Sequence, residues 1–386
     1  MSVTRDMLQS LPTARDPCNV IQMLPSVLLD RENVGGSEAG LQAGVTAKGD
    51  PTGGANNTWA IDGLVVTDPT AVGSSPGFWD FDSFEEMNIV TGGADVSVQT
   101  AGVAVNMVTR RGGNKISFGG RYYLTDHAFQ ANNLTDSLRS QGVTGINKIN
   151  QIKDYGFNLG GPIIRDKAWL WLAYGVQDID TVLLDGSSQK PMLKSYAAKL
   201  NLQPVATNRF EALWMANSTE YSGRYASSSF PEGYDQESRF NLGNPIVKIQ
   251  DEQMFGDNLL VSAKFGYTDS GTRLVPHGDP DLTTLYTYDA TTDVSYGNSY
   301  PLTKRPAYSY GLHSQLYKDK LFGASHDIKM GVEYSTRRSI TDSSAAGQLK
   351  LSYNLASPDI DPTGTGNPVF TPGMRQWMLA TSNSSD

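Results

Sequence analysis

From residue 115 onward the chain repeats one pattern, in which apolar residues alternate with polar or small ones. A period of two places successive side chains on opposite faces of a β-strand. Each stretch runs for about ten residues, the length that a tilted strand needs to cross the hydrocarbon layer of a membrane. The clearest examples are Ile116 to Leu124, Tyr196 to Leu202, Phe210 to Ala216, Leu259 to Tyr267 and Ile328 to Tyr334.

The connections between these stretches alternate in length, which a soluble sandwich has no reason to show. The long ones are 126–153, 179–192, 221–243 and 270–306, and the short ones are 164–167, 205–208, 255–258 and 319–325. Outer-membrane barrels combine short turns on one side with long loops on the other. Rings near strand ends, such as Tyr174, Tyr267 and Tyr334, fit the aromatic girdle of such a barrel. The pattern therefore favours an antiparallel transmembrane β-barrel.

Composition supports strands and narrows the classes of partner. Charged residues make up 18% of the 386 residues, below the roughly 25% of soluble domains, and there are 39 Gly. A net charge of −9 argues against nucleic acid as a partner. The single cysteine, Cys18, excludes an internal disulfide and is expected to be a small buried residue in a helix. No apolar run reaches the ~20 residues of a transmembrane helix.

The first 114 residues differ in character and indicate a mixed α/β unit. A short helix is expected within Thr13–Pro25, where apolar residues recur at helical spacing before a proline. A glycine-rich loop follows at Gly35–Gly54. The Asp62-Gly63 pair between two apolar runs predicts a tight hairpin. Further strands are expected near 84–90 and 103–109.

Several short motifs carry a resemblance to a known family. They are Leu11–Asp16, Leu24–Val27, Trp59–Gly63, Phe84–Met87, Thr91–Gly93, Val103–Asn114, Leu159–Ile163 and Ser325–Tyr334. In this order and spacing the chain resembles the TonB-dependent outer-membrane receptors, and more narrowly their Oar-like subgroup. It departs from the family at Ser26, where a glycine is common, so the loop after the first helix is expected to bend differently.

The resemblance implies an α+β plug domain over residues 1–114 and the N-terminal part of an antiparallel transmembrane β-barrel over 115–386. The glycines before Asn114 are expected to need permissive φ where the chain turns into the first barrel strand. The stretch Ala168–Tyr174 is apolar on both faces, and its inner face is expected to pack against the plug. About 8–10 strands of an expected 22 can be recognised, so the chain is expected to be an incomplete receptor. Its first residues show neither a signal peptide nor an energy-coupling box, and residues 381–386 lack a terminal aromatic strand.

The function implied is active transport across the bacterial outer membrane, with a scarce or large substrate bound on outer loops and the plug apex. Phe78, Trp79 and Asp80 are the candidate ligand contacts, chosen by position. The implied partners are the TonB complex, through a segment not found in this chain, outer-membrane lipid and an unknown ligand: siderophore, cobalamin, oligosaccharide and peptide all remain open. Two alternatives are an Oar-like adhesion or secretion-associated barrel and a soluble β-rich binding module.

Enzyme chemistry finds no support in the sequence. The sequence contains no G-x-x-x-x-G-K-[ST] phosphate-binding loop, no H-E-x-x-H zinc motif and no G-x-S-x-G nucleophile elbow. No two of its four histidines have the spacing of metal ligands. The acidic stretch Asp359–Asn367 has oxygen ligands at a spacing that could hold calcium, but its position in a long loop favours a plain polar turn. No catalytic residue, cofactor or metal site is therefore expected.

Overall fold

The structure of the protein is a computed structural model. It describes residues 1–10, 15–25, 27–29, 44–47, 50, 54–71, 73–74, 77–92, 100, 102–183, 186, 188–227, 229–231, 233–279, 281, 286–289, 293–296, 299–321, 324–345, 349–353, 376–379 and 383–385. Three features singled out in the sequence lie outside these residues: most of the glycine-rich loop Gly35–Gly54, Ser26 and the acidic stretch Asp359–Asn367.

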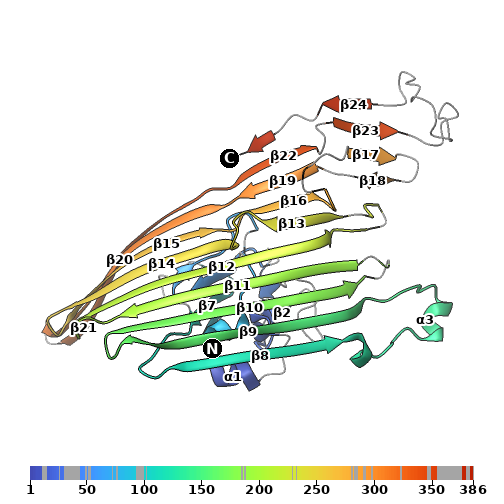
Figure 1. The fold of residues 1–386 in the computed structure, drawn as a ribbon. Helices are drawn as coiled ribbons and strands as arrows, with labels where there is room; N and C mark the ends of the chain where they lie inside the picture. Colours follow the sequence, from blue (N-terminus) through green and yellow to red (C-terminus); the bar gives the residue numbers. More distant parts are fainter. Residues whose placement is uncertain are drawn as a thin grey trace.

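Two principal β-sheets make up the fold (Figure 1). The first, called the small sheet below, has five strands in the order β1-β6-β7-β4-β5. Their bounds are β1 Ser2–Thr4, β4 Thr58–Ile61, β5 Leu64–Val65, β6 Phe84–Val90 and β7 Ala104–Thr109. Around it lie α1 (Arg5–Ser10), α2 (Pro17–Ile21), the 3-10 turn η1 (Phe81–Ser83) and the pair β2 (Val27–Leu29) and β3 (Val45–Ala47).

The expected helix is present but short, because α2 occupies only five residues of the Thr13–Pro25 stretch. It begins where the Asp16 side chain accepts a hydrogen bond from the Cys18 backbone N–H, an N-cap that satisfies one unpaired donor of the first turn. Cys18 is 2% exposed, which confirms the expectation of a buried residue in a helix. Across the residues that the structure describes, no helix is long and apolar enough to span a membrane.

The expected hairpin at Asp62-Gly63 is confirmed. Antiparallel β4 and β5 are joined by these two residues, whose φ angles are 48° and 74°. Positive φ at both central positions is the geometry of a type I′ turn, which favours Asp or Asn followed by Gly. The local sequence thus fixes the position of the Asp62 carboxylate at the tip of the hairpin.

The second sheet, called the large sheet below, has 14 strands among the described residues. Its longest strands pair antiparallel in the order β8-β9-β10-β11-β12-β14-β15-β20-β21. They are β8 Ser117–Asp126, β9 Lys148–Ile164, β10 Ala168–Val182, β11 Ser188–Leu202, β12 Asn208–Arg224, β14 Asn244–Phe255, β15 Leu259–Asp269, β20 Pro306–Leu321 and β21 Ala324–Arg337. Tight turns gather at one end of this sheet and the longer connections at the other (Figure 1).

The long connections contain more structure than the sequence indicated. The 126–153 connection holds η2 (His127–Phe129) and the short helix α3 (Asp136–Ser140). Other connections carry β13 Tyr234–Ser238, β16 Thr272–Pro276, β17 Tyr286–Asp289, β18 Val294–Tyr296 and β19 Ser299–Lys304, and after β21 come β22 Ile340–Ala345, β23 Leu349–Tyr353, β24 Gln376–Leu379 and β25 Asn383–Ser385. The expectation of a long loop at 179–192 is wrong, because β10 continues to Val182 and β11 already begins at Ser188. These strand ends are polar, so the apolar alternation that marked the strands stops before the hydrogen-bonded ladder does.

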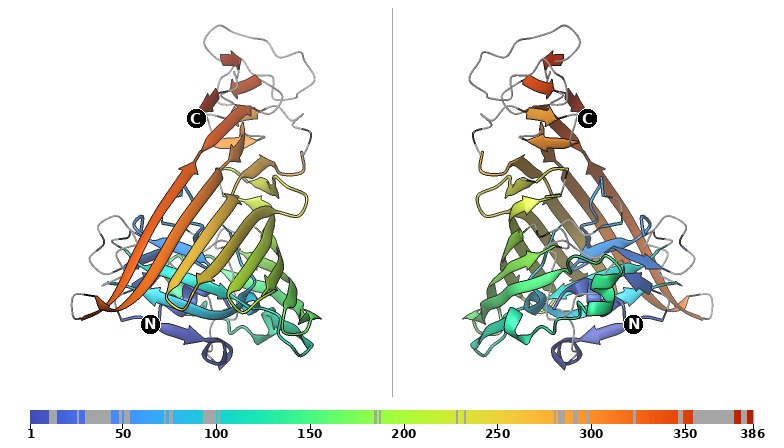
Figure 2. Two further views of the ribbon diagram at one scale, coloured as in Figure 1. Left: turned by 90° about the vertical axis from the view of Figure 1, so that its left-hand side faces the viewer. Right: turned by 90° about the vertical axis from the view of Figure 1, so that its right-hand side faces the viewer.

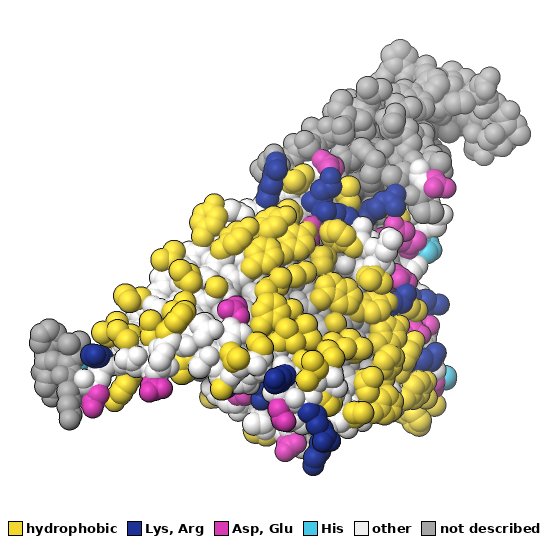
Figure 3. Space-filling view, turned by 60° about the vertical axis from the view of Figure 1, so that its left-hand side comes forward, with side chains coloured by type: hydrophobic (Ala, Val, Ile, Leu, Met, Phe, Trp, Pro, Cys, Tyr) yellow, Lys and Arg dark blue, Asp and Glu magenta, His cyan; other side chains and the backbone are white. Residues whose placement is uncertain are grey.

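The two faces of the large sheet reverse the arrangement of a soluble protein. On β8 the apolar Phe118 and Tyr122 are 74% and 62% exposed, whereas the Arg121 side chain between them is only 9% exposed. Figure 3 shows apolar side chains gathered over the outer face, with charged ones mainly around the edges of this apolar area. An apolar band on the outside and polar groups within are the pattern of a sheet that faces lipid.

The small sheet lies against the inner face of the large sheet (Figure 2). One core cluster joins them, because buried residues of the small sheet pack with residues of β10, β11, β12 and β14. Trp171 of β10 and Trp59 of β4 are 0% and 2% exposed in this cluster. The expectation that the inner face of Ala168–Tyr174 packs against the N-terminal unit is therefore confirmed.

The chain passes from β7 to β8 through Gly112 and Gly113, and the expected reason for these glycines is wrong. Neither has a positive φ. A Cβ on Gly112 would instead lie 2.5 Å from the Leu170 carbonyl oxygen, so the backbone of β10 requires a glycine there. Asn114 then ties this passage to the β9–β10 turn, since its Oδ1 accepts hydrogen bonds from the Asp166 N–H (2.9 Å) and Trp169 Nε1 (2.7 Å).

Candidate functional site

The three candidate ligand contacts form one extended segment between the two sheets. Phe78, Trp79 and Asp80 are 9%, 5% and 7% exposed, and η1 follows directly after them. The structure therefore places all three at the contact between the small and large sheets, and none on the outer surface. Their assignment as ligand contacts remains a prediction.

Both backbone polar groups of Phe78 bond to side chains of the large sheet. Its N–H donates to Asn217 Oδ1 at 3.3 Å, and its carbonyl accepts from Ser195 Oγ at 3.2 Å. Asn217 Nδ2 also donates to Ser195 Oγ at 3.3 Å, which closes a triangle of bonds. The ring packs in a separate apolar cluster with Ile149, Ile152, Ile179 and Leu193.

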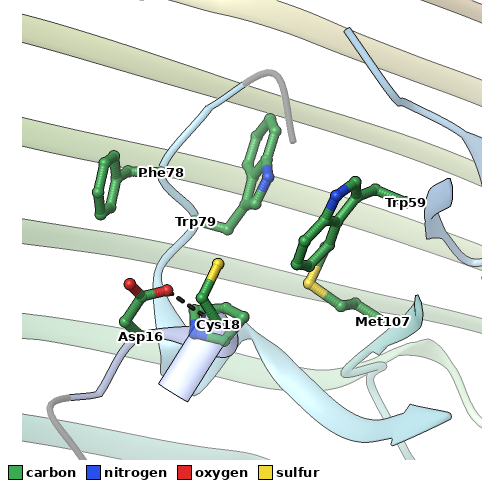
Figure 4. Close-up of a pocket in the computed structure, with 7 residues that line it drawn as sticks. Asp16, Cys18, Trp59, Phe78, Trp79 and Met107 are labelled. Atoms are coloured by element: carbon green, nitrogen blue, oxygen red, sulfur yellow. Dashed lines mark hydrogen bonds between the residues drawn. The ribbon is translucent and has the colours of Figure 1, made fainter. Parts of the chain in front are cut away.

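Trp79 lines a small internal cavity near α2. Figure 4 shows its ring between Phe78 on one side and Trp59 and Met107 on the other, with Cys18 below. The cavity measures about 10 Å³, roughly the space that one water molecule requires. In this state of the molecule it is too small to hold a transported substrate.

Asp80 belongs to a largely buried cluster of five charged groups that joins the two sheets. Arg121 of β8 contacts Asp80 at 2.6 Å, Asp82 at 3.0 Å and Asp154 of β9 at 2.9 Å. Arg15 contacts Asp82 at 2.6 Å and Asp154 at 3.1 Å. Three carboxylates thus face two guanidinium groups. Burial raises the pKa of Asp80, Arg121 lowers it, and the neighbouring carboxylates of Asp82 and Asp154 raise it again.

This raised pKa predicts a pH-dependent difference between the wild-type protein and Asp80→Asn. The native state binds the Asp80 proton more tightly than the unfolded state, so the contribution of Asp80 to stability becomes more favourable as pH falls through the raised native pKa toward 3.8. Asparagine cannot take up that proton. Urea unfolding in detergent micelles, compared at neutral and mildly acidic pH, is expected to favour the wild type increasingly as pH falls. A difference that does not change with pH would contradict this account.

A second chain of charges runs from the hairpin tip into the large sheet. Lys199 Nζ of β11 lies 2.9 Å from Asp62 and 3.1 Å from Glu211 of β12, and Lys248 of β14 lies 2.8 Å from the other oxygen of Glu211. Asp62 also accepts the Thr109 N–H at 2.9 Å. The Lys199 and Lys248 side chains are 5% and 4% exposed, so each positive charge is buried with a carboxylate partner, as burial requires.

A third contact links the loop after β5 to the connection that precedes β20. Arg305 contacts Asp68 at 2.8 Å, and Ser270 Oγ donates to the same carboxylate at 2.9 Å. Beside it, Arg239 contacts Asp269 at 3.0 Å within the large sheet. In all three contacts, therefore, carboxylates of the small-sheet unit meet cationic side chains of the large sheet.

Sequence reasoning missed the cationic partners of these contacts, although a signal was present. Arg121 and Lys199 occupy inward positions of strands whose outward positions are apolar. A charged side chain at an inward position of a lipid-facing strand must meet water or a counter-charge. Among the described residues, no group of three or more His, Cys, Asp or Glu side chains could hold a metal ion.

Comparison with known proteins agrees with this architecture. No family model matches the chain. A stretch of 123 residues, 31% of the chain, is 33% identical to the TonB-dependent transporter Oar of Myxococcus xanthus and covers 11% of that protein. Among solved structures, the outer membrane transporter YddB of Escherichia coli matches 100% of this chain and 52% of its own, with a TM-score of 0.72 and 14% identity. The siderophore receptor PirA of Acinetobacter baumannii matches 95% of this chain and 50% of its own, with a TM-score of 0.61 and 12% identity.

The mostly β-strand fold is that of the TonB-dependent outer-membrane receptors, and the protein is an outer-membrane protein. The partial identity to a TonB-dependent transporter confirms the resemblance carried by its motifs. More particularly, the sequence likeness is to the transporter Oar. The proteins that it resembles are transporters and receptors rather than enzymes. The chain spans about half the length of the solved structures and 11% of the curated relative.

Proposed function

We propose that the protein is an active transport receptor of the outer membrane, energised by the TonB complex, for a substrate too large or scarce for porins. Residues 1–114 act as the plug, and residues 115–386 are the first part of the barrel, with 8–10 of about 22 membrane-spanning strands. The support for this division is a small sheet that lies against the polar inner face of a lipid-facing large sheet.

The observation that carries the proposal is the chemistry of the contact between the sheets. Two buried contacts pair Asp62 with Lys199 and Asp80 with Arg121, and a partly buried one pairs Asp68 with Arg305. A buried ion pair adds little net stability over an apolar contact, because the desolvation of both charges offsets their attraction. Together with the shared apolar cluster, such pairs fix the orientation of the plug. When the interface opens, the charged groups of these pairs can exchange each other for water.

Uptake measurements test the proposal. Accumulation of ferric siderophores, cobalamin, oligosaccharides and peptides is compared in cells with the gene, without it, and with the gene but without TonB. The proposal expects that uptake of at least one of these compounds is lost both in cells without the gene and in cells without TonB. Normal uptake combined with a defect in surface attachment or secretion would contradict it and support an adhesion or secretion-associated barrel.

Within this proposal, Phe78, Trp79 and Asp80 contact the ligand once their segment leaves its buried position. Trp79 offers the largest ring and is 5% exposed in the closed arrangement. Trp79→Ala is expected to weaken ligand affinity at least tenfold, which is about 1.4 kcal/mol. Equilibrium binding of the ligand identified by uptake measures the effect, and unchanged affinity would refute the assignment.

A further inference from the structure

Five residues of the large sheet form a straight row on its inner face, across the strands. Arg121 of β8 pairs in register with Gly156 of β9, and Gly156 with Gly175 of β10. Gly175 then pairs with Ser195 of β11, and Ser195 with Asn217 of β12. Neighbouring strands lie roughly 4.8 Å apart, so the row extends for about 19 Å. It is called the transverse row below.

The Gly77–Asp80 segment runs along this row. A Cβ on Gly77 would meet the Asn217 side chain at 3.0 Å, Phe78 bonds to Asn217 and Ser195, and Asp80 bonds to Arg121 at the far end. Figure 4 shows the segment with Phe78 and Trp79 crossing the strands behind it. The segment therefore meets the large sheet through one row of side chains from separate strands.

The two glycines of the row make this close approach possible. A Cβ on Gly175 would lie 2.8 Å from Asp80 Cγ and 2.9 Å from Arg121 Nη2. A Cβ on Gly156 would lie 2.9 Å from Arg121 Nη1. A side chain at Gly175 would occupy the space in which the Asp80 carboxylate and the Arg121 guanidinium meet, and one at Gly156 would press on the guanidinium and on the Tyr174 carbonyl oxygen. The transverse row thus has two glycines beside Arg121, where the segment approaches the backbone closely. Hydrogen-bonding side chains lie at both of its ends, Arg121 at one and Ser195 with Asn217 at the other.

We propose that Arg121, Ser195 and Asn217 are positioning residues that hold the Phe78–Asp80 segment against the barrel wall and so control when it can reach a ligand. This inference rests on the proposed function, because the segment contains the candidate ligand contacts. Asn217 and Ser195 fix the backbone of Phe78, and Arg121 fixes the acidic end. Arg15, which contacts Asp82 and Asp154, balances the surplus of carboxylates beside Arg121.

The single cysteine provides a natural reporter of this segment. Cys18 is 2% exposed and lines the same cavity as Phe78 and Trp79, so release of the segment uncovers its thiol. Isolated outer membranes that contain the full protein are treated with a maleimide reagent, and the rate of Cys18 modification is followed by mass spectrometry. No ligand and no TonB complex is needed for the measurement.

Arg121→Gln and Asn217→Ala are each expected to raise the modification rate at least tenfold, and Arg121→Lys less. Asp80→Asn combined with Arg121→Gln is expected to add little to Arg121→Gln alone, because both changes remove the same contact. Lys194→Met is the matched control, since the Lys194–Glu220 pair lies on the outer side of β11 and its side chains are 26% and 53% exposed. The rate of Cys18 modification in Lys194→Met should equal that of the wild type. If Asn217→Ala fails to reach the membrane, Ser195→Ala removes one hydroxyl of the same contact and takes its place.

A purely structural role is distinguished by Lys199→Met, which breaks a contact away from the row. The Cys18 modification rate of each variant is compared with its loss of unfolding free energy. If the transverse row holds the segment locally, variants of Arg121, Ser195 and Asn217 have faster Cys18 modification than Lys199→Met for the same loss of unfolding free energy. An equal or smaller exposure would overturn the proposal. Because the rates are measured without substrate, this result is independent of the uptake experiment, so a failure of the positioning role can be told apart from a failure of the transport function.

Discussion

Replacing Lys199 by methionine is expected to lower the free energy of unfolding by about 3–5 kcal/mol, the range for removing one partner of a buried ion pair. Methionine keeps most of the volume of the side chain, so the loss reports the charge rather than a cavity. Lys199 Nζ lies between Asp62 and Glu211, at 2.9 Å and 3.1 Å. Without it the Asp62 carboxylate stays buried and loses its cationic partner, whereas Glu211 keeps Lys248. Urea unfolding in detergent micelles, followed by tryptophan fluorescence, measures the change.

The control is the same substitution at Lys194, five residues earlier on the same strand and therefore on its other face. Lys194 pairs with Glu220 at 2.6 Å, yet both side chains are partly exposed, and such pairs contribute about 0–1 kcal/mol. Lys194→Met should therefore change stability little. Equal losses for Lys199→Met and Lys194→Met would show that the buried chain of charges does not hold the hairpin to the large sheet.

Much of the fold could be predicted because it is encoded locally. The alternation from Ile116 to Leu124 predicts β8, and the Asp62-Gly63 pair predicts the tight turn between β4 and β5. Each prediction succeeds because the feature depends on neighbouring residues alone. The ends of the strands were predicted less well. Outside the lipid a strand no longer needs an apolar face, so the hydrogen-bonded ladder of β10 and β11 continues without a sequence signal.

The candidate site could be predicted only in part, because its partners are remote in sequence. Asp62 and Lys199 are separated by 137 residues, and Phe78 and Ser195 by 117. The alternation shows that Lys199 and Ser195 share a face, and this face is polar enough to suggest a protein or water partner. Which carboxylate meets which cation depends on how the small sheet docks, and no local pattern encodes that. The position of Phe78–Asp80 was likewise expected at an apex and is found between the sheets.

A large steric effect is expected at Gly112, where the chain passes from the small sheet to β8. In Gly112→Ala the new Cβ would lie 2.5 Å from the Leu170 carbonyl oxygen and 3.0 Å from that of Gly161. Both oxygens belong to backbone in the β9–β10 ladder, so neither can move without disturbing strand pairing. Stability is expected to fall by about 3 kcal/mol, the upper part of the usual range for overpacking. Urea unfolding measures this loss.

The adjacent glycine separates a steric cause from a change in backbone entropy. A Cβ on Gly113 has no atom within 4 Å, and its φ is not positive. Gly113→Ala restricts the unfolded chain in the same way as Gly112→Ala does but meets no neighbour, so its effect should stay within about 0.5 kcal/mol or be slightly stabilising. If both variants lose the same stability, the close approach to Leu170 is not what requires glycine at residue 112. In that case the link between the small sheet and the large sheet tolerates a wider separation than the contacts of Asn114 with Asp166 and Trp169 imply.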